Sequence, residues 1–117
     1  MIAETQVTDA QLVALAERLG WTIKPNGLIA RLEGGLIRYM EPQGLRTWEG
    51  FGAIQAAMAG LGYRLETITM PDGSATAVFL REKVGGGYDE GYGESLNSAP
   101  DAVVLAARAA LGVRGEA

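Results

Sequence analysis

The sequence predicts an α+β fold, a single-domain three-layer αβα sandwich in which about three helices cover a small, mainly antiparallel sheet. Two patterns carry this prediction. Residues 63–83 read as a β-hairpin with apolar side chains on both faces of its second strand, and three segments elsewhere carry helical spacing or helix caps. The 117 residues match the usual size of one domain. We expect residues 1–6 and 113–117 to fray.

The hairpin is built around a tight turn at residues 71–74, Pro-Asp-Gly-Ser. The proline presets φ at the first corner, and the glycine accepts the positive φ that closes the turn. Successive side chains of a strand point to opposite faces, so Ala77 and Phe79 lie on one face and Val78 and Leu80 on the other. A strand that is apolar on both faces needs cover on both, which favours helices on either side of the sheet.

The first helix is expected to begin after Thr8, which caps it while Gln11 reaches back from the third helical position. Gly20 ends it. Apolar residues recur every three or four positions and predict its buried stripe: Leu12, Leu15, Ala16 and Leu19.

Residues 28–32 and 36–40 are two apolar runs on either side of a Gly-Gly pair, a pattern typical of a hairpin. Arg31 and Arg38 lie within these runs. We expect an edge position with both guanidinium groups in water; the alternative is an anion-binding site.

A second helix is expected over residues 48–61, capped by Thr47. Gly50 and Gly52 weaken its first turns, and close approach to another backbone would explain them. Apolar residues at helical spacing predict one buried face: Trp48, Phe51, Ile54, Met58 and Leu61.

Residues 85–97 are rich in glycine and tyrosine and predict a loop. This loop is either a solvated linker or a surface that presents tyrosine rings to a partner, because tyrosine supplies contact area at low entropy cost. Its acids could alternatively bind a small ligand or a divalent metal through oxygen, although their spacing matches no calcium loop. The candidate partner-binding residues are Tyr88, Asp89, Glu90, Tyr92 and Glu94.

A last helix is expected to open at Ser98, with Pro100 and Asp101 in its first turn. From Ala102 to Leu111 the segment is small and apolar except for Arg108. We expect this helix to lie buried against the sheet.

The composition argues against several classes of function. The sequence contains no histidine and no cysteine. The commonest general base is therefore missing, and no thiolate can serve as a nucleophile or as a metal ligand. We therefore expect no catalytic residues, no cofactor and no enzymatic activity. A net charge of −4 disfavours binding to nucleic acid. The sequence has no apolar run long enough for a membrane span and no leader pattern, which predicts a cytoplasmic protein.

Three stretches resemble the phage ABA-sandwich domain, a family of small phage and prophage proteins. They are residues 15–21 (Leu-Ala-Glu-Arg-Leu-Gly-Trp), the helix start at Thr47-Trp48, and residues 99–111, where a proline opens a small-residue run that ends in Arg-Ala-Ala-Leu. The resemblance implies an αβα sandwich over residues 9–112. It supplies no catalytic residue, because members of this family are mostly of unknown function.

These patterns together predict a non-catalytic accessory protein that acts through contacts with a partner protein or through self-association. An unpaired strand edge at residues 36–40 is one route to self-association. The competing hypothesis is a module that binds a small ligand or divalent metal at Asp89, Glu90 and Glu94.

Overall fold

A computed structural model describes residues 7–112, and the expected fraying of residues 1–6 and 113–117 lies outside that range. The elements follow in the order α1 (Asp9–Arg18), β1 (Thr22–Ile23), β2 (Ile29–Glu33), β3 (Leu36–Met40), the 3₁₀ helix η1 (Pro42–Arg46), α2 (Trp48–Gly60), β4 (Arg64–Thr69), β5 (Ala75–Glu82), β6 (Tyr88–Ser95) and α3 (Ala99–Leu111). None of the helices within the described range is long and apolar enough to cross a membrane.

Local signals place the helices where the sequence predicts them. Thr8 and Gln11 form the complete capping box of α1. The Thr47 hydroxyl accepts a hydrogen bond from the Gly50 backbone N–H at the start of α2, and the Ser98 hydroxyl accepts one from Asp101 in α3. Each cap satisfies a backbone donor that the first helical turn leaves without an intrahelical partner.

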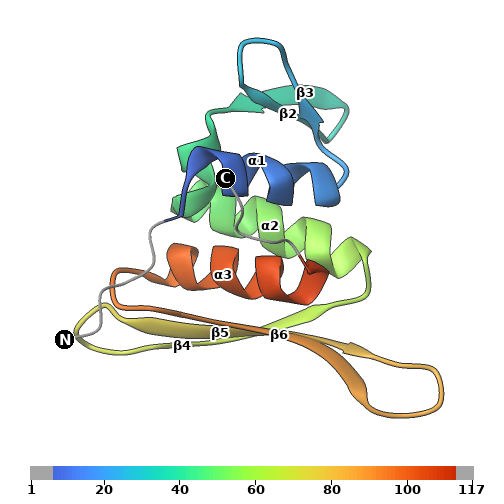
Figure 1. Cartoon of the computed structure of the whole chain (residues 1–117), viewed down its shortest axis with the longest axis vertical. Coiled ribbons are helices and arrows are strands. Elements are labelled where there is room, and N and C mark those ends of the chain that lie inside the picture. The colour runs from blue at the N-terminus through green and yellow to red at the C-terminus, as the bar shows by residue number, and fades with distance from the viewer. Residues whose placement is uncertain (1–6, 113–117) are drawn as a thin grey trace.

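The strands form two antiparallel sheets, ordered β1-β2-β3 and β4-β5-β6. Figure 1 shows the helices stacked between them: α3 lies on β4-β5-β6, while α1 and α2 lie between α3 and the β1-β2-β3 sheet, which we call the small sheet. The predicted α+β class, with three α-helices and antiparallel strands, is confirmed. The strands are divided between two sheets, and each sheet receives helices on one face.

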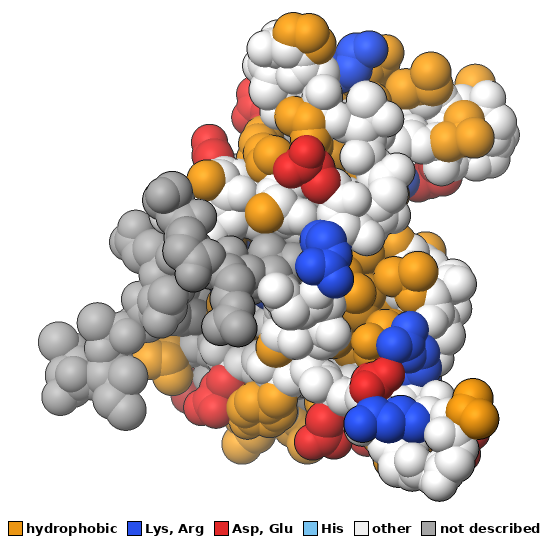
Figure 2. Space-filling model, turned by 45° about the vertical axis from the view of Figure 1, so that its right-hand side comes forward, with side chains coloured by type: hydrophobic (Ala, Val, Ile, Leu, Met, Phe, Trp, Pro, Cys, Tyr) orange, Lys and Arg blue, Asp and Glu red, His pale blue; other side chains and the backbone are white. Residues whose placement is uncertain are grey.

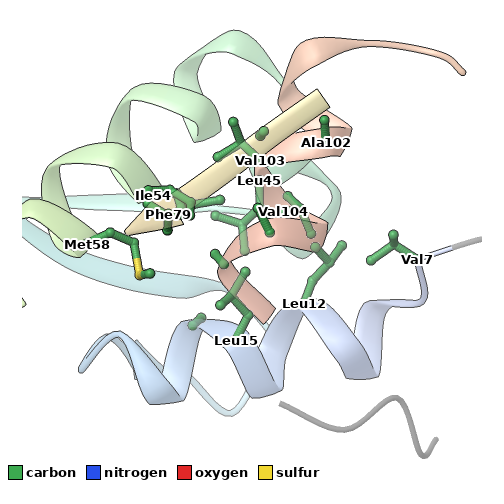
Figure 3. Close-up of a cluster of buried hydrophobic side chains, with 14 of the residues drawn as sticks. Val7, Leu12, Leu15, Leu45, Ile54, Met58, Phe79, Ala102, Val103 and Val104 are labelled. Carbon is green, nitrogen blue, oxygen red and sulfur yellow. The ribbon is translucent and has the colours of Figure 1, made fainter. Parts of the chain in front are cut away.

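The core lies between the helices and the inner face of β5 (Figure 3). Phe79 points from β5 toward Ile54 and Met58 of α2, and all three are fully buried. Each such side chain contributes about 1.5–3 kcal/mol by leaving water. Leucines from α1 and η1 and valines from α3 complete this cluster: Leu12, Leu15, Leu45, Val103 and Val104.

The predicted buried face of α2 is wrong at its two ends. Trp48 is 67% exposed and Leu61 is also exposed, whereas Ile54 and Met58 are fully buried. The helix begins at Trp48, so that residue lies beyond the core and packs on Phe51 with ring centroids 5.2 Å apart. The close approach predicted for the helix glycines holds at Gly50, where a Cβ would lie 2.4 Å from the Leu45 backbone, while Gly52 has open space.

Candidate partner-binding surface

Residues 88–95 are not a loop but strand β6, paired along its length with β5. Within the predicted loop, Gly85–Gly87 form the turn before β6, with positive φ at all three glycines, and residues 96–97 form a bend after it. The alternation of the strand divides the candidate residues between two faces. Tyr88, Glu90, Tyr92 and Glu94 lie on the face of β6 that points away from α3, and Asp89 lies on the opposite face with Gly91, Gly93 and Ser95.

Close packing of α3 explains the glycines of β6. A Cβ on Gly91 would lie 2.3 Å from the Ala106 carbonyl oxygen, and a Cβ on Gly93 would lie 2.3 Å from that of Ala102. Side chains larger than hydrogen would therefore push α3 off the sheet. In the sequence these glycines suggest a flexible loop, but in the structure they allow α3 to pack tightly on a regular strand.

The outer face of the β4-β5-β6 sheet carries apolar and aromatic side chains that no described element covers. The register places Val78 between Glu66 and Tyr92, and Leu80 between Arg64 and Glu90. Tyr92 is 57% exposed. Orange and red side chains alternate along the lower border of Figure 2, where this sheet lies. We call this surface the outer face; its apolar members are Ile68, Val78, Leu80, Tyr88 and Tyr92.

The outer face has net negative charge, with four glutamates against one arginine: Glu66, Glu82, Glu90, Glu94 and Arg64. Arg64 pairs with Glu66 at 3.2 Å and lies 5.7 Å from the Tyr88 ring centroid. The Tyr92 hydroxyl donates a hydrogen bond to Glu94 at 3.1 Å. That carboxylate raises the pKa of Tyr92, because it accepts the proton and would repel a phenolate.

Asp89 has a structural role on the opposite face. Its carboxylate accepts a hydrogen bond from Arg81 Nη2 at 2.8 Å and lies 3.6 Å from Lys83 Nζ. The hydrogen bond from Arg81 lowers the pKa of Asp89. The Arg81 guanidinium also lies 4.6 Å from the centroid of the Tyr63 ring, so this ion pair fixes the end of the sheet to the segment that enters β4.

The hypothesis of a metal or ligand site at Asp89, Glu90 and Glu94 does not match this geometry. Asp89 lies on the opposite face of β6 from Glu90 and Glu94, so the three carboxylates do not face one ion. Residues 7–112 contain no group of three or more acidic side chains that could hold a metal ion.

A cleft of about 550 Å³ lies between the β2-β3 hairpin and α2. Its charged residues form a ladder of alternating sign: Glu49 lies 3.7 Å from Arg31, Arg31 pairs with Glu33, and Glu33 lies 3.7 Å from Arg38. The Arg31 hydrogen bond lowers the pKa of Glu33. Trp21, Trp48 and small α2 residues line the rest of the cleft.

The expectation that both arginine heads lie in water is wrong for Arg31, whose side chain is buried beneath the hairpin, and holds for Arg38. The predicted alternative of an anion site is not favoured either, because two carboxylates already neutralise Arg31. The ladder ties β2 to α2, which explains a buried arginine without a ligand.

Neither family models nor characterised proteins nor solved structures gave a match to this chain. The resemblance to the phage ABA-sandwich domain therefore stays a prediction.

Proposed function

We propose that this protein is a non-catalytic accessory protein that binds a basic, apolar segment of a partner protein on the outer face of β4-β5-β6. The observation that carries this proposal is a sheet face that no described element covers, on which exposed Tyr88, Tyr92 and Ile68 surround half-buried Val78 and Leu80 among surplus glutamates. Contiguous exposed apolar surface rimmed by polar residues is typical of interaction sites.

The charge of the outer face selects the partner. A segment that carries lysine or arginine beside apolar residues would pair with Glu82, Glu90 and Glu94 while it covers Val78 and Tyr92. Complementary charge accelerates encounter and disfavours wrong partners. A second copy of the same face would bring glutamates against glutamates, so this surface favours a different protein.

Tyr88 and Tyr92 are the expected centres of the binding energy. Tyrosine is enriched among the few interface residues whose loss costs most. Both rings stand on a strand that is paired with β5, and α3 packs behind Tyr92 at the neighbouring Gly91 and Gly93. A partner therefore meets rings on a fixed backbone, which lowers the entropy cost of binding.

Selection from a displayed library of short random peptides tests this proposal. We expect the wild-type protein to enrich peptides that combine lysine or arginine with aromatic or aliphatic residues. The Tyr88→Ala/Tyr92→Ala variant should lose this enrichment. Tyr39→Ala is the matched control, because Tyr39 is 56% exposed on the other sheet; this variant should enrich the same peptides as wild type.

Three results would overturn the proposal: enrichment of acidic peptides, no enrichment at all, or undiminished enrichment by the double variant. Circular dichroism of each variant confirms that the comparison is between folded proteins.

A further inference from the structure

We infer that the β3 strand is a self-association edge, at which two copies of this chain join their small sheets in antiparallel register about Ile37. This inference concerns a surface separate from the outer face and does not depend on the proposed function.

The edge itself is the first observation. The small sheet has the order β1-β2-β3, so β3 is a terminal strand that pairs with β2 on one side. Four consecutive residues of β3 are exposed, Leu36 to Tyr39, which means that both faces of the strand reach the surface. The strand contains neither lysine nor proline, which commonly protect exposed edges, and its one charged side chain, Arg38, lies on the helix-facing side, 3.7 Å from Glu33. Such a strand is a template for another strand.

The chemistry of the sheet surface is the second observation. The face of β2-β3 that points away from the helices carries paired Leu32 and Ile37, then paired Ala30 and Tyr39, with no charged side chain among them. Ile37 is 61% exposed. Figure 2 shows orange side chains gathered at the top of the molecule, where this hairpin lies. An uncharged surface meets no like charge when an identical copy approaches, so a symmetric dimer can use it.

The charge of Arg38 selects the register. Arg38 lies on the helix-facing side of β3, directly opposite Arg31 of β2. A two-fold axis through Arg38 would place two arginines opposite each other, which is destabilising. An axis through Ile37 instead places Arg38 opposite Leu36 of the second copy. The two Ile37 side chains would then lie next to each other, with Leu32 of each copy on the outside, and the four side chains would form one aliphatic row across both sheets.

Cysteine cross-linking tests both the contact and its register, because the natural chain contains no cysteine. An axis through Ile37 brings the two Ile37→Cys residues directly opposite, within the Cα separation of a disulfide. Tyr39→Cys is the matched control, as its side chain is exposed on the same face. In this register the two Tyr39 Cα atoms are offset by roughly 13 Å along the strands.

Under mild oxidation we expect Ile37→Cys to form disulfide-linked dimers at least roughly tenfold faster than Tyr39→Cys, since only its thiols come within disulfide range. Sedimentation equilibrium should give the dimer mass for wild type and the monomer mass for Ile37→Lys. Tyr92→Lys, on the other sheet, should remain dimeric.

Equal rates for the two cysteine variants, or faster linkage through Tyr39→Cys, would overturn the register. If the wild type is monomeric at all concentrations tested, β3 does not join two copies of this chain. That holds whether the strand edge is then free or pairs with a strand of another protein. Neither result bears on the peptide selection.

Discussion

Gly91 and Gly93 determine how closely α3 can lie on the sheet. In each of them a hydrogen takes the place of a Cβ that would lie within 2.5 Å of the α3 backbone. Sequence patterns indicate flexibility wherever glycines cluster, so they predict a loop here. What distinguishes a tightly packed strand from a flexible loop here is the contact of these glycines with α3, which follows later in the chain. Local sequence patterns do not contain that contact.

Gly93→Ala should destabilise the fold by about 1–3 kcal/mol, because the added methyl group overlaps backbone that cannot yield without moving α3. Gly52→Ala is the matched control. Its Cβ would meet open space on α2, and alanine should stabilise that helix by up to about 1 kcal/mol. Urea unfolding at neutral pH measures both changes. If the two variants have the same stability, close packing is not the reason for glycine at position 93.

The Asp89–Arg81 ion pair should make stability depend on pH at the acid end. The pKa of Asp89 is lower in the folded protein than in the unfolded chain, so its contribution is present above the unfolded value of about 4 and is lost as the pH falls below it. The difference in unfolding free energy between wild type and Asp89→Asn should therefore be larger at neutral pH than in acid. An equal difference at both pH values would contradict this role.

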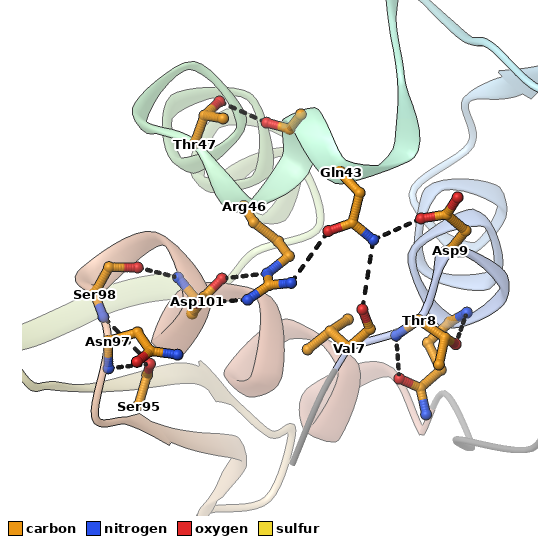
Figure 4. A network of polar contacts seen from close by, with 12 residues as sticks. Val7, Thr8, Asp9, Gln43, Arg46, Thr47, Ser95, Asn97, Ser98 and Asp101 are labelled. Carbon is orange, nitrogen blue, oxygen red and sulfur yellow. Dashed lines mark hydrogen bonds and ion pairs between the residues drawn. The ribbon is translucent and has the colours of Figure 1, made fainter. Parts of the chain in front are cut away.

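Between elements, η1 serves as a clamp that joins α1 to α3 (Figure 4). Arg46 Nε and Nη2 donate to the two carboxylate oxygens of Asp101 at 2.6 and 3.0 Å, and Gln43 Nε2 donates to Asp9 at 2.5 Å. Asp101 is buried, and this bidentate pair provides both oxygens of its carboxylate with hydrogen-bond donors.

Asp101→Ala should cost about 2–4 kcal/mol, less than the loss for a fully buried pair because Arg46 partly reaches water. The control is Arg64→Ala, which breaks an exposed pair with Glu66 and should change stability by less than about 1 kcal/mol. Thermal or urea unfolding compares the two variants. Equal effects would show that the clamp contributes no more than a surface pair.

The sequence predicts elements well where the signal is local. The Thr8 capping box, the Thr47 and Ser98 caps and the turn at residues 71–74 all hold. Sequence patterns fail where the neighbour is distant in the chain. Val78 and Leu80 indicate a face that needs cover, but they do not say whether a helix of this chain or a partner supplies it.

At the scale of the whole molecule, placing the helices between two sheets leaves one face of each sheet for contacts (Figure 1). The two faces differ in chemistry. The β4-β5-β6 face combines tyrosines with surplus glutamates, whereas the β2-β3 face lacks charge along its paired rows. The sequence places all five candidate partner-binding residues in a loop; in the structure they lie on strand β6, four of them on the outer face and Asp89 on the opposite face because of strand alternation.

A dimer joined through β3 would carry two outer faces. A partner with two basic segments, or many copies of one, would then bind more tightly than a single face allows, provided that both faces can be engaged together. The proposed self-association and the proposed partner binding are therefore compatible with each other.

Titration calorimetry with one library-selected basic peptide tests whether the outer face binds a basic partner segment. The outer face predicts that Tyr92→Ala weakens binding by roughly tenfold or more, that added salt weakens binding to wild type, and that Tyr39→Ala binds as wild type does. An affinity that neither Tyr92→Ala nor salt changes would contradict binding at the outer face and place the binding site elsewhere.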